Sequence, residues 1–114
     1  MMLTDLDPVF LRCVIVDGTQ EHVRVDTLEE AEGVMFLCPQ CYKANDGPVG
    51  THLVICWSLR APHDAVPGPG LWVLTGTSFD DLSLTAPAGS SSSILLTSGC
   101  HWHGWITNGE VRQA

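Results

Sequence analysis

The chain has 114 residues, of which 45% are hydrophobic and 16% charged; this is not a disordered composition, and it fits one domain spanning residues 1–114. Its formal net charge is −8, from 5 Lys and Arg against 13 Asp and Glu. The acidity argues against a protein that binds phosphate backbones or anionic membrane surfaces, because both need a basic footprint.

The N-terminal stretch MMLTDLDPVF lacks both a basic start and a long hydrophobic run. We therefore expect no signal peptide and no membrane span, and a cytosolic setting follows by default. In a cytosol, five cysteines are more often metal ligands or free thiols than disulfides.

Short runs rich in β-branched and aromatic residues alternate with Gly- and Pro-rich loops. Only the segment 26–33, DTLEEAEG, has a helical pattern, with Asp26 or Thr27 as its cap. The pattern predicts an all-β fold, a small sandwich or half-open barrel with at most one short helix. The expected strands are 9–16, 22–25, 33–38, 51–59, 71–76, 82–86 and 93–98, then a hairpin over 102–112 that turns at Asn108-Gly109; the expected loops are 45–50, 61–70 and 86–93.

Two residue pairs have the spacing of zinc knuckles. Cys38 and Cys41 form a C-x2-C pair at the end of an expected strand, and Cys100 and His103 form a C-x2-H pair. Zinc prefers four tetrahedral nitrogen and sulfur ligands, and a turn can aim both members of such a pair at one ion. We therefore predict that a structural Zn²⁺ staples the fold through Cys38, Cys41, Cys100 and His103. Four such ligands fill the site and leave no position for a catalytic water.

Several alternatives stay open for this site. His101 or His52 could replace His103, although His101 faces away from Cys100 if the segment is extended. The C-x2-C pair could be redox active, but the residues YKANDGPVG after the knuckle are not expected to begin the helix that such chemistry uses. The cysteines could also be unrelated core residues.

The remaining chemically distinctive residues have simpler expected roles. Cys13 is expected in the core. Cys56 lies four residues after His52 and is expected on the same half-buried strand face, while His22 and His63 are expected at the surface. Four tryptophans are expected to cover the metal site and fill the core, with an aromatic binding patch as the alternative: Trp57, Trp72, Trp102 and Trp105.

The succession of a cysteine knuckle, GTHLVICW, PGPGLW, TGTSFDDLSL and SILLTSGCHWHGWITNGEV resembles a family of small phage and prophage proteins that often carry the label ammonia monooxygenase. It is also similar to a wider bacterial family of domains of unknown function. The resemblance covers roughly 33–112. Position 101 is often glycine in the phage relatives, so the resemblance implies His103 as the ligand. The shared tail motif C-x-W-H-G-[WF]-[IV]-x-[ND]-G is met by Cys100, Trp102, His103, Gly104, Trp105, Ile106, Asn108 and Gly109.

The resemblance implies a phage origin but no established activity. The chain lacks the histidine-rich copper site that the label would require, and it has neither the H-x-E of a nucleobase deaminase nor H-E-x-x-H. We predict a protein-interaction module for phage assembly or host-factor binding in the host cytoplasm; virion association and homo-oligomers stay open. The alternatives are a zinc- or thiol-dependent enzyme that uses His101 or His52, and a nucleic-acid-binding zinc ribbon.

Overall fold

The computed structural model describes residues 1–62, 72–87, 92–96 and 99–114. Most of the expected loop 61–70, part of the expected loop 86–93 and His63 lie outside the described residues. Residues at the ends of two expected strands, 71 and 97–98, lie outside them as well.

Four strands form the largest sheet of the described chain, in the spatial order β2-β1-β3-β4 with all neighbours antiparallel. Each was expected from the sequence, with ends that differ by up to three residues. Their bounds are Val9–Val16 for β1, Thr19–Val25 for β2, Gly33–Leu37 for β3 and Leu53–Trp57 for β4.

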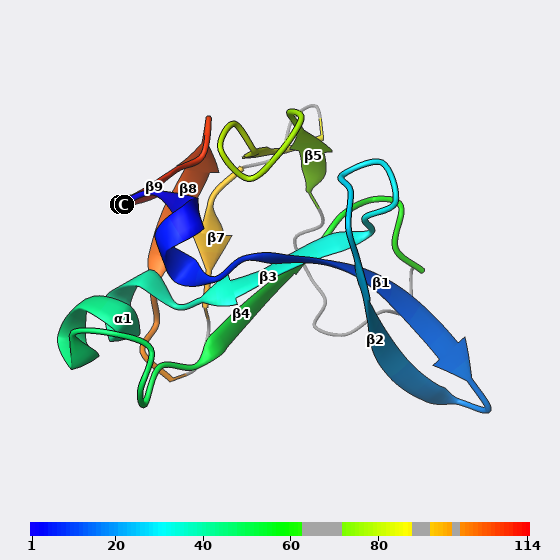
Figure 1. The fold of residues 1–114 in the computed structure, drawn as a ribbon, viewed down its shortest axis with the longest axis horizontal. Coiled ribbons are helices and arrows are strands. Elements are labelled where there is room, and N and C mark those ends of the chain that lie inside the picture. Colours follow the sequence, from blue (N-terminus) through cyan, green and yellow to red (C-terminus); the bar gives the residue numbers. More distant parts are fainter. Residues whose placement is uncertain (63–71, 88–91, 97–98) are drawn as a thin grey trace.

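Two smaller sheets lie beside the large one (Figure 1). One pairs β5 with β6, and the other has the order β7-β8-β9. None of the described sheets closes into a barrel, so the all-β prediction is confirmed with open sheets. The bounds are Val73–Thr75 for β5, Ser83–Thr85 for β6, Ile94–Leu95 for β7, His103–Thr107 for β8 and Glu110–Gln113 for β9.

The main hydrophobic core joins one face of the large sheet to the smaller sheets. At its centre Phe36 of β3 meets Trp102 edge to face, with ring centroids 6.3 Å apart, and both side chains are buried. The opposite face of the large sheet carries a second, smaller cluster around Leu11, Cys13 and Trp57. Because both faces are covered near the centre of this sheet, β3 is apolar along its whole length.

Two hairpin turns have the geometry that matches the twist of the flanking strands. Asn108 and Gly109 both have positive φ, 49° and 75°, between β8 and β9. Asp17 and Gly18, between β1 and β2, also have positive φ, 51° and 76°. Positive φ at both central residues is the mark of a type I′ turn, so the predicted turn at Asn108-Gly109 is confirmed.

The predicted helix at 26–33 is wrong. The hydroxyl of Thr27 does accept a bond from the N–H of Glu30, at 3.3 Å, as a helix cap would. However, the segment forms only turns, and β3 begins at Gly33. The local capping signal is real, but the pairing of Gly33 with Leu11 in the sheet leaves no room for a helix.

Among the described residues the α-helix is α1, Pro39–Asn45, and one 3-10 turn, η1, covers Leu3–Leu6. The expectation that no helix could begin at the knuckle is therefore wrong. Pro39 occupies the first helical position, where its fixed φ and missing N–H are tolerated. Asp46 ends the helix with a φ of 53°, and the N–H of Gly47 donates to the carbonyl of Tyr42 at 3.0 Å, which completes a Schellman motif.

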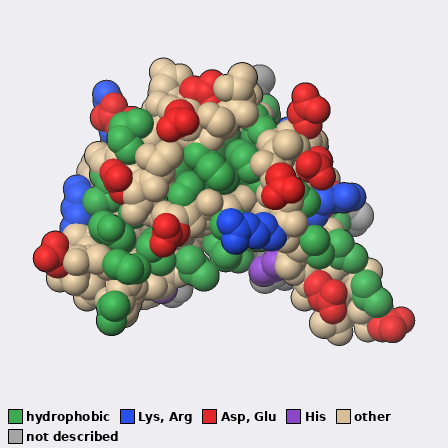
Figure 2. Space-filling view, viewed as in Figure 1, with side chains coloured by type: hydrophobic (Ala, Val, Ile, Leu, Met, Phe, Trp, Pro, Cys, Tyr) green, Lys and Arg blue, Asp and Glu red, His purple; other side chains and the backbone are tan. Residues whose placement is uncertain are grey.

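The outer part of the β1–β2 hairpin, residues 12–23, extends away from the body of the molecule and is called the β1–β2 arm (Figure 1). Strand β3 pairs with β1 only from Val9 to Leu11, so the arm is a two-stranded ribbon. The same view in space-filling form shows acidic side chains scattered over the surface without one dominant acidic patch (Figure 2). On this face the acidic side chains are therefore spread and not clustered.

Candidate metal centre

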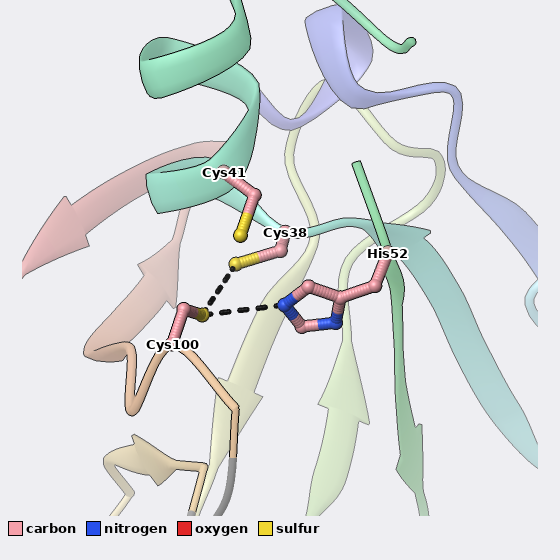
Figure 3. Close-up of side chains that lie close together, drawn as sticks. All are labelled: Cys38, Cys41, His52 and Cys100. Carbon is pink, nitrogen blue, oxygen red and sulfur yellow. Dashed lines mark hydrogen bonds between the residues drawn. The ribbon is translucent and has the colours of Figure 1, made fainter. Parts of the chain in front are cut away.

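Three cysteines and one histidine meet at one end of β3, and they could hold a metal ion (Figure 3). The potential ligand atoms of Cys38, Cys41, His52 and Cys100 all lie within 4.8 Å of one another. In a tetrahedral zinc site with Zn–S bonds of about 2.3 Å, sulfur atoms are separated by about 3.8 Å. The side chains are therefore already gathered at the scale of one coordination sphere.

The junction between β3 and α1 positions the two knuckle cysteines. Cys38 follows the last residue of β3 and caps the helix, and its carbonyl accepts the N–H of Tyr42 at 2.9 Å. Cys41 lies in the first turn of α1. The change from extended to helical backbone bends the chain between them, so both thiols point toward the side on which Cys100 and His52 lie. Cys38 is buried and Cys41 is half-buried.

Strand pairing brings His52 to the same place. The antiparallel register of β3 and β4 matches Leu37 with Leu53, and continuing it by one residue sets Cys38 opposite His52. The N–H of Cys38 donates to the carbonyl of His52 at 2.9 Å, which confirms this continuation. The ring is exposed, and its Nε2 lies 3.2 Å from the sulfur of Cys100.

Cys100 reaches the cluster from a tight turn near the other end of the sequence. Gly99 and His101 on either side of it both have left-handed φ, 67° and 55°. The side chain of Gln40 in α1 donates to the carbonyl of Cys100 at 3.0 Å. Two residues later Trp102 is buried in the main core, which anchors the turn against the sheet. The sulfur of Cys100 lies 3.3 Å from that of Cys38.

The three thiols of the cluster differ in acidity. Burial is the main cause that raises the pKa of Cys38 to about 12. Burial and then the neighbouring Cys100 raise the pKa of Cys41. At Cys100 burial is outweighed by hydrogen bonds, first from His52 and then from Cys38, and the pKa falls to about 7. Near neutral pH Cys100 is therefore the first of the three thiols to become a thiolate, which is the form of cysteine that binds metal.

His103 and His101, the two histidines beside Cys100, lie outside the group. His103 is the first residue of β8, on the same strand face as the exposed Trp105, and the two rings lie 5.8 Å apart. His101 is exposed at a left-handed turn. The spacing predicted a second knuckle, but the buried Trp102 forces the chain from turn to strand between Cys100 and His103. The fourth side chain of the cluster is thus His52.

The other singled-out residues follow the expectations more closely. Cys13 is buried in the second core cluster, as predicted. Cys56 is fully buried, more than expected, and lies outside the metal group. His22 is exposed, with its ring 5.3 Å from that of Trp57. Trp57, Trp72 and Trp102 fill the core, whereas Trp105 is partly exposed at 37%.

The open sheets and this group define a small all-β protein with a Cys₃His cluster able to hold a metal ion. No protein-family model matches the chain, and neither a curated protein nor a solved structure matches it. The resemblance to phage proteins therefore stays a prediction. Within the described part of the chain, no helix has the length and apolar character needed to cross a membrane.

Proposed function

We propose that this protein binds one Zn²⁺ through Cys38, Cys41, His52 and Cys100, and that the ion is structural. The single observation that carries the proposal is the gathering of these four ligand atoms within 4.8 Å. Three soft thiolates and one imidazole are a donor set that zinc prefers, and together they complete a tetrahedron. A complete tetrahedron has no place for an activated water, which favours a structural ion over a catalytic one.

The positions of the ligands along the chain explain what such an ion would do. It would join the β3–α1 junction to the start of β4 and to a turn 62 residues beyond Cys38. Closing a long loop removes conformational freedom from the unfolded chain, and a small domain has little other stability to spare. Binding of structural zinc is then largely folding free energy, on the order of 10 kcal/mol in small domains.

Elemental analysis tests this directly. Protein expressed without a metal-binding tag and purified without added metal should contain close to one zinc per chain. A chelator should lower its melting temperature, and zinc should restore it. Purified protein that contains no metal, and whose melting curve does not change with chelator, would contradict the proposal.

At the biological level we propose that the zinc-stapled domain is a protein-interaction module, with a phage or host protein as partner. The proposal draws on the resemblance to phage proteins and on the β1–β2 arm. Val14, Val16 and Val23 lie on the same side of the ribbon and are 36%, 49% and 43% exposed. They alternate there with the exposed polar side chains of Arg12, Thr19 and Glu21. A two-stranded ribbon with exposed valines suits a partner that adds a β-strand to its edge.

The partner can be sought by affinity capture from infected cells. A protein captured by the wild type should be lost with the double variant Val14→Lys and Val23→Lys. The matched control is Val49→Lys, because Val49 is 85% exposed in the loop after α1, away from the arm. If both variants capture the same protein as well as the wild type does, the arm is not the binding surface.

A further inference from the structure

The metal group also contains two cysteines that are placed to react with each other. The sulfur atoms of Cys38 and Cys100 lie 3.3 Å apart, and both thiols are free. A disulfide needs its sulfur atoms at about 2.0 Å, so the pair has to close by little more than 1 Å. Figure 3 shows dashed lines from the sulfur of Cys100 to that of Cys38 and to the ring of His52.

The two sulfur atoms differ in their access to solvent. Cys38 is buried, whereas Cys100 is half-buried and lies beside the exposed ring of His52. A small oxidant dissolved in water can therefore reach Cys100 before it reaches Cys38. The buried Cys13 and Cys56 lie outside the group, so neither is placed to compete as a partner.

We infer that Cys100 is a site of oxidation by peroxides, and that Cys38 then captures it as a Cys38–Cys100 disulfide and releases the metal. The inference rests on the proposed metal site, although the disulfide itself does not require the ion. It gives the site a second role, because the same residues that hold the zinc report the presence of an oxidant.

The reaction balances in two steps. The thiolate of Cys100 attacks one oxygen of hydrogen peroxide; the O–O bond breaks, hydroxide leaves and a sulfenic acid forms. The thiol of Cys38 gives up its proton and attacks that sulfur; the S–S bond forms, and the departing hydroxide takes the proton and leaves as water. The two sulfurs together lose two electrons, and the peroxide gains them. Cys41 and His52 then remain as the only two ligands, which are too few to retain the ion.

The product would keep the fold closed. The disulfide joins the same two segments that the metal joins, the end of β3 and the turn at Cys100. The long loop between them stays closed after the metal leaves. What changes is local, because Cys41 in α1 and His52 before β4 are no longer held together. The segment from residue 42 to residue 51, which is the end of α1 and the loop after it, thus becomes the part that responds to oxidation.

Peroxide treatment of the zinc-loaded wild type, at one to ten equivalents, tests the inference. A chromogenic zinc chelator should register the loss of one zinc per chain, and thiol counting should register the loss of two thiols. Digestion with trypsin should give a disulfide-linked pair of peptides, 25–43 with 61–112, and fragmentation should assign it to Cys38 and Cys100. A thiol reductant should reverse all three changes.

Two variants sharpen the assignment. Cys41→Ser should still form the Cys38–Cys100 disulfide. The double variant Cys38→Ser with Cys41→Ser, which leaves Cys100 no second thiol in the group, should accumulate a sulfenic acid on Cys100 that dimedone traps. If either variant fails to fold, peptide mapping of the wild type still decides. A Cys38–Cys41 or Cys41–Cys100 bond as the main product would overturn the inference. Protein that forms the Cys38–Cys100 bond but never contained zinc would refute the metal site and leave the disulfide standing.

Discussion

Replacement of His52 by alanine should cost the protein about 2–3 kcal/mol of stability and part of its zinc, because Cys38, Cys41 and Cys100 still offer three thiols to the ion. The ring is exposed, so the change removes a ligand without opening a cavity in the core. If the ion acts as a cross-link, His52 closes a loop of eleven residues from Cys41, and closing such a loop is worth about 3 kcal/mol. The existing pairing of β3 with β4 already restricts this loop, so the figure is an upper value.

The expected stability loss translates into a shift that is easy to measure. A chain of this length unfolds with an entropy that makes 1 kcal/mol worth about 4 °C in melting temperature. Circular dichroism should therefore show a fall of about 8–12 °C for His52→Ala. His103→Ala is the matched control, because its half-buried ring contacts Trp105 outside the metal group. It should keep its zinc and lose less than about 4 °C, as surface changes usually do.

A rescue variant separates ligation from other effects of the histidine. His52→Cys offers zinc a fourth thiolate and should recover both the metal and most of the melting temperature. The reasoning fails if His103→Ala loses the zinc while His52→Ala keeps it. It also fails if His52→Cys is no better than His52→Ala, because the role of His52 would then not be that of a ligand.

Three further outcomes follow from the structure. Cys56→Ser should lower the stability of the protein, because it places a hydroxyl at a fully buried position. It should leave the zinc content near one per chain, as measured by elemental analysis of the folded fraction. In chelator-treated protein kept below its melting temperature, alkylation of Cys100 should be half-maximal near pH 7, because its lowered pKa makes it a thiolate above that pH. The raised pKa of Cys38 should leave that thiol unlabelled until far higher pH. Mass spectrometry of pulse-labelled peptides measures both reactions, and labelling of Cys38 before Cys100 would contradict the prediction. Gly33→Ala should lower the melting temperature by about 4–12 °C, because the new Cβ would collide with the ring of Trp57 and lie 2.9 Å from the carbonyl of Cys56; an unchanged melting curve would show that β3 and β4 can separate without cost.

Local patterns were sufficient to predict much of this protein. The β-rich runs located the strands, and Asn108-Gly109 identified its hairpin turn, because backbone preferences and two-residue turns depend on neighbours in sequence. Spacing also singled out Cys38, Cys41 and Cys100, which the structure gathers. Local signals misled where sheet pairing opposed them, as at Thr27, whose capping bond forms in a segment that never becomes a helix.

Which histidine lies with the three cysteines depends on tertiary structure. In sequence Cys100 and His103 have the spacing of a knuckle, whereas His52 is 48 residues from Cys100. The burial of Trp102 turns the chain away after Cys100, and the register of β3 with β4 sets His52 beside Cys38. Register depends on which strands pair and on how the chain between them is folded, and here that chain contains a helix that local pattern did not predict. The sequence by itself therefore determined the strands and the three thiols, while only the packed sheets decided which histidine joins them, because that choice depends on contacts between residues far apart in the chain.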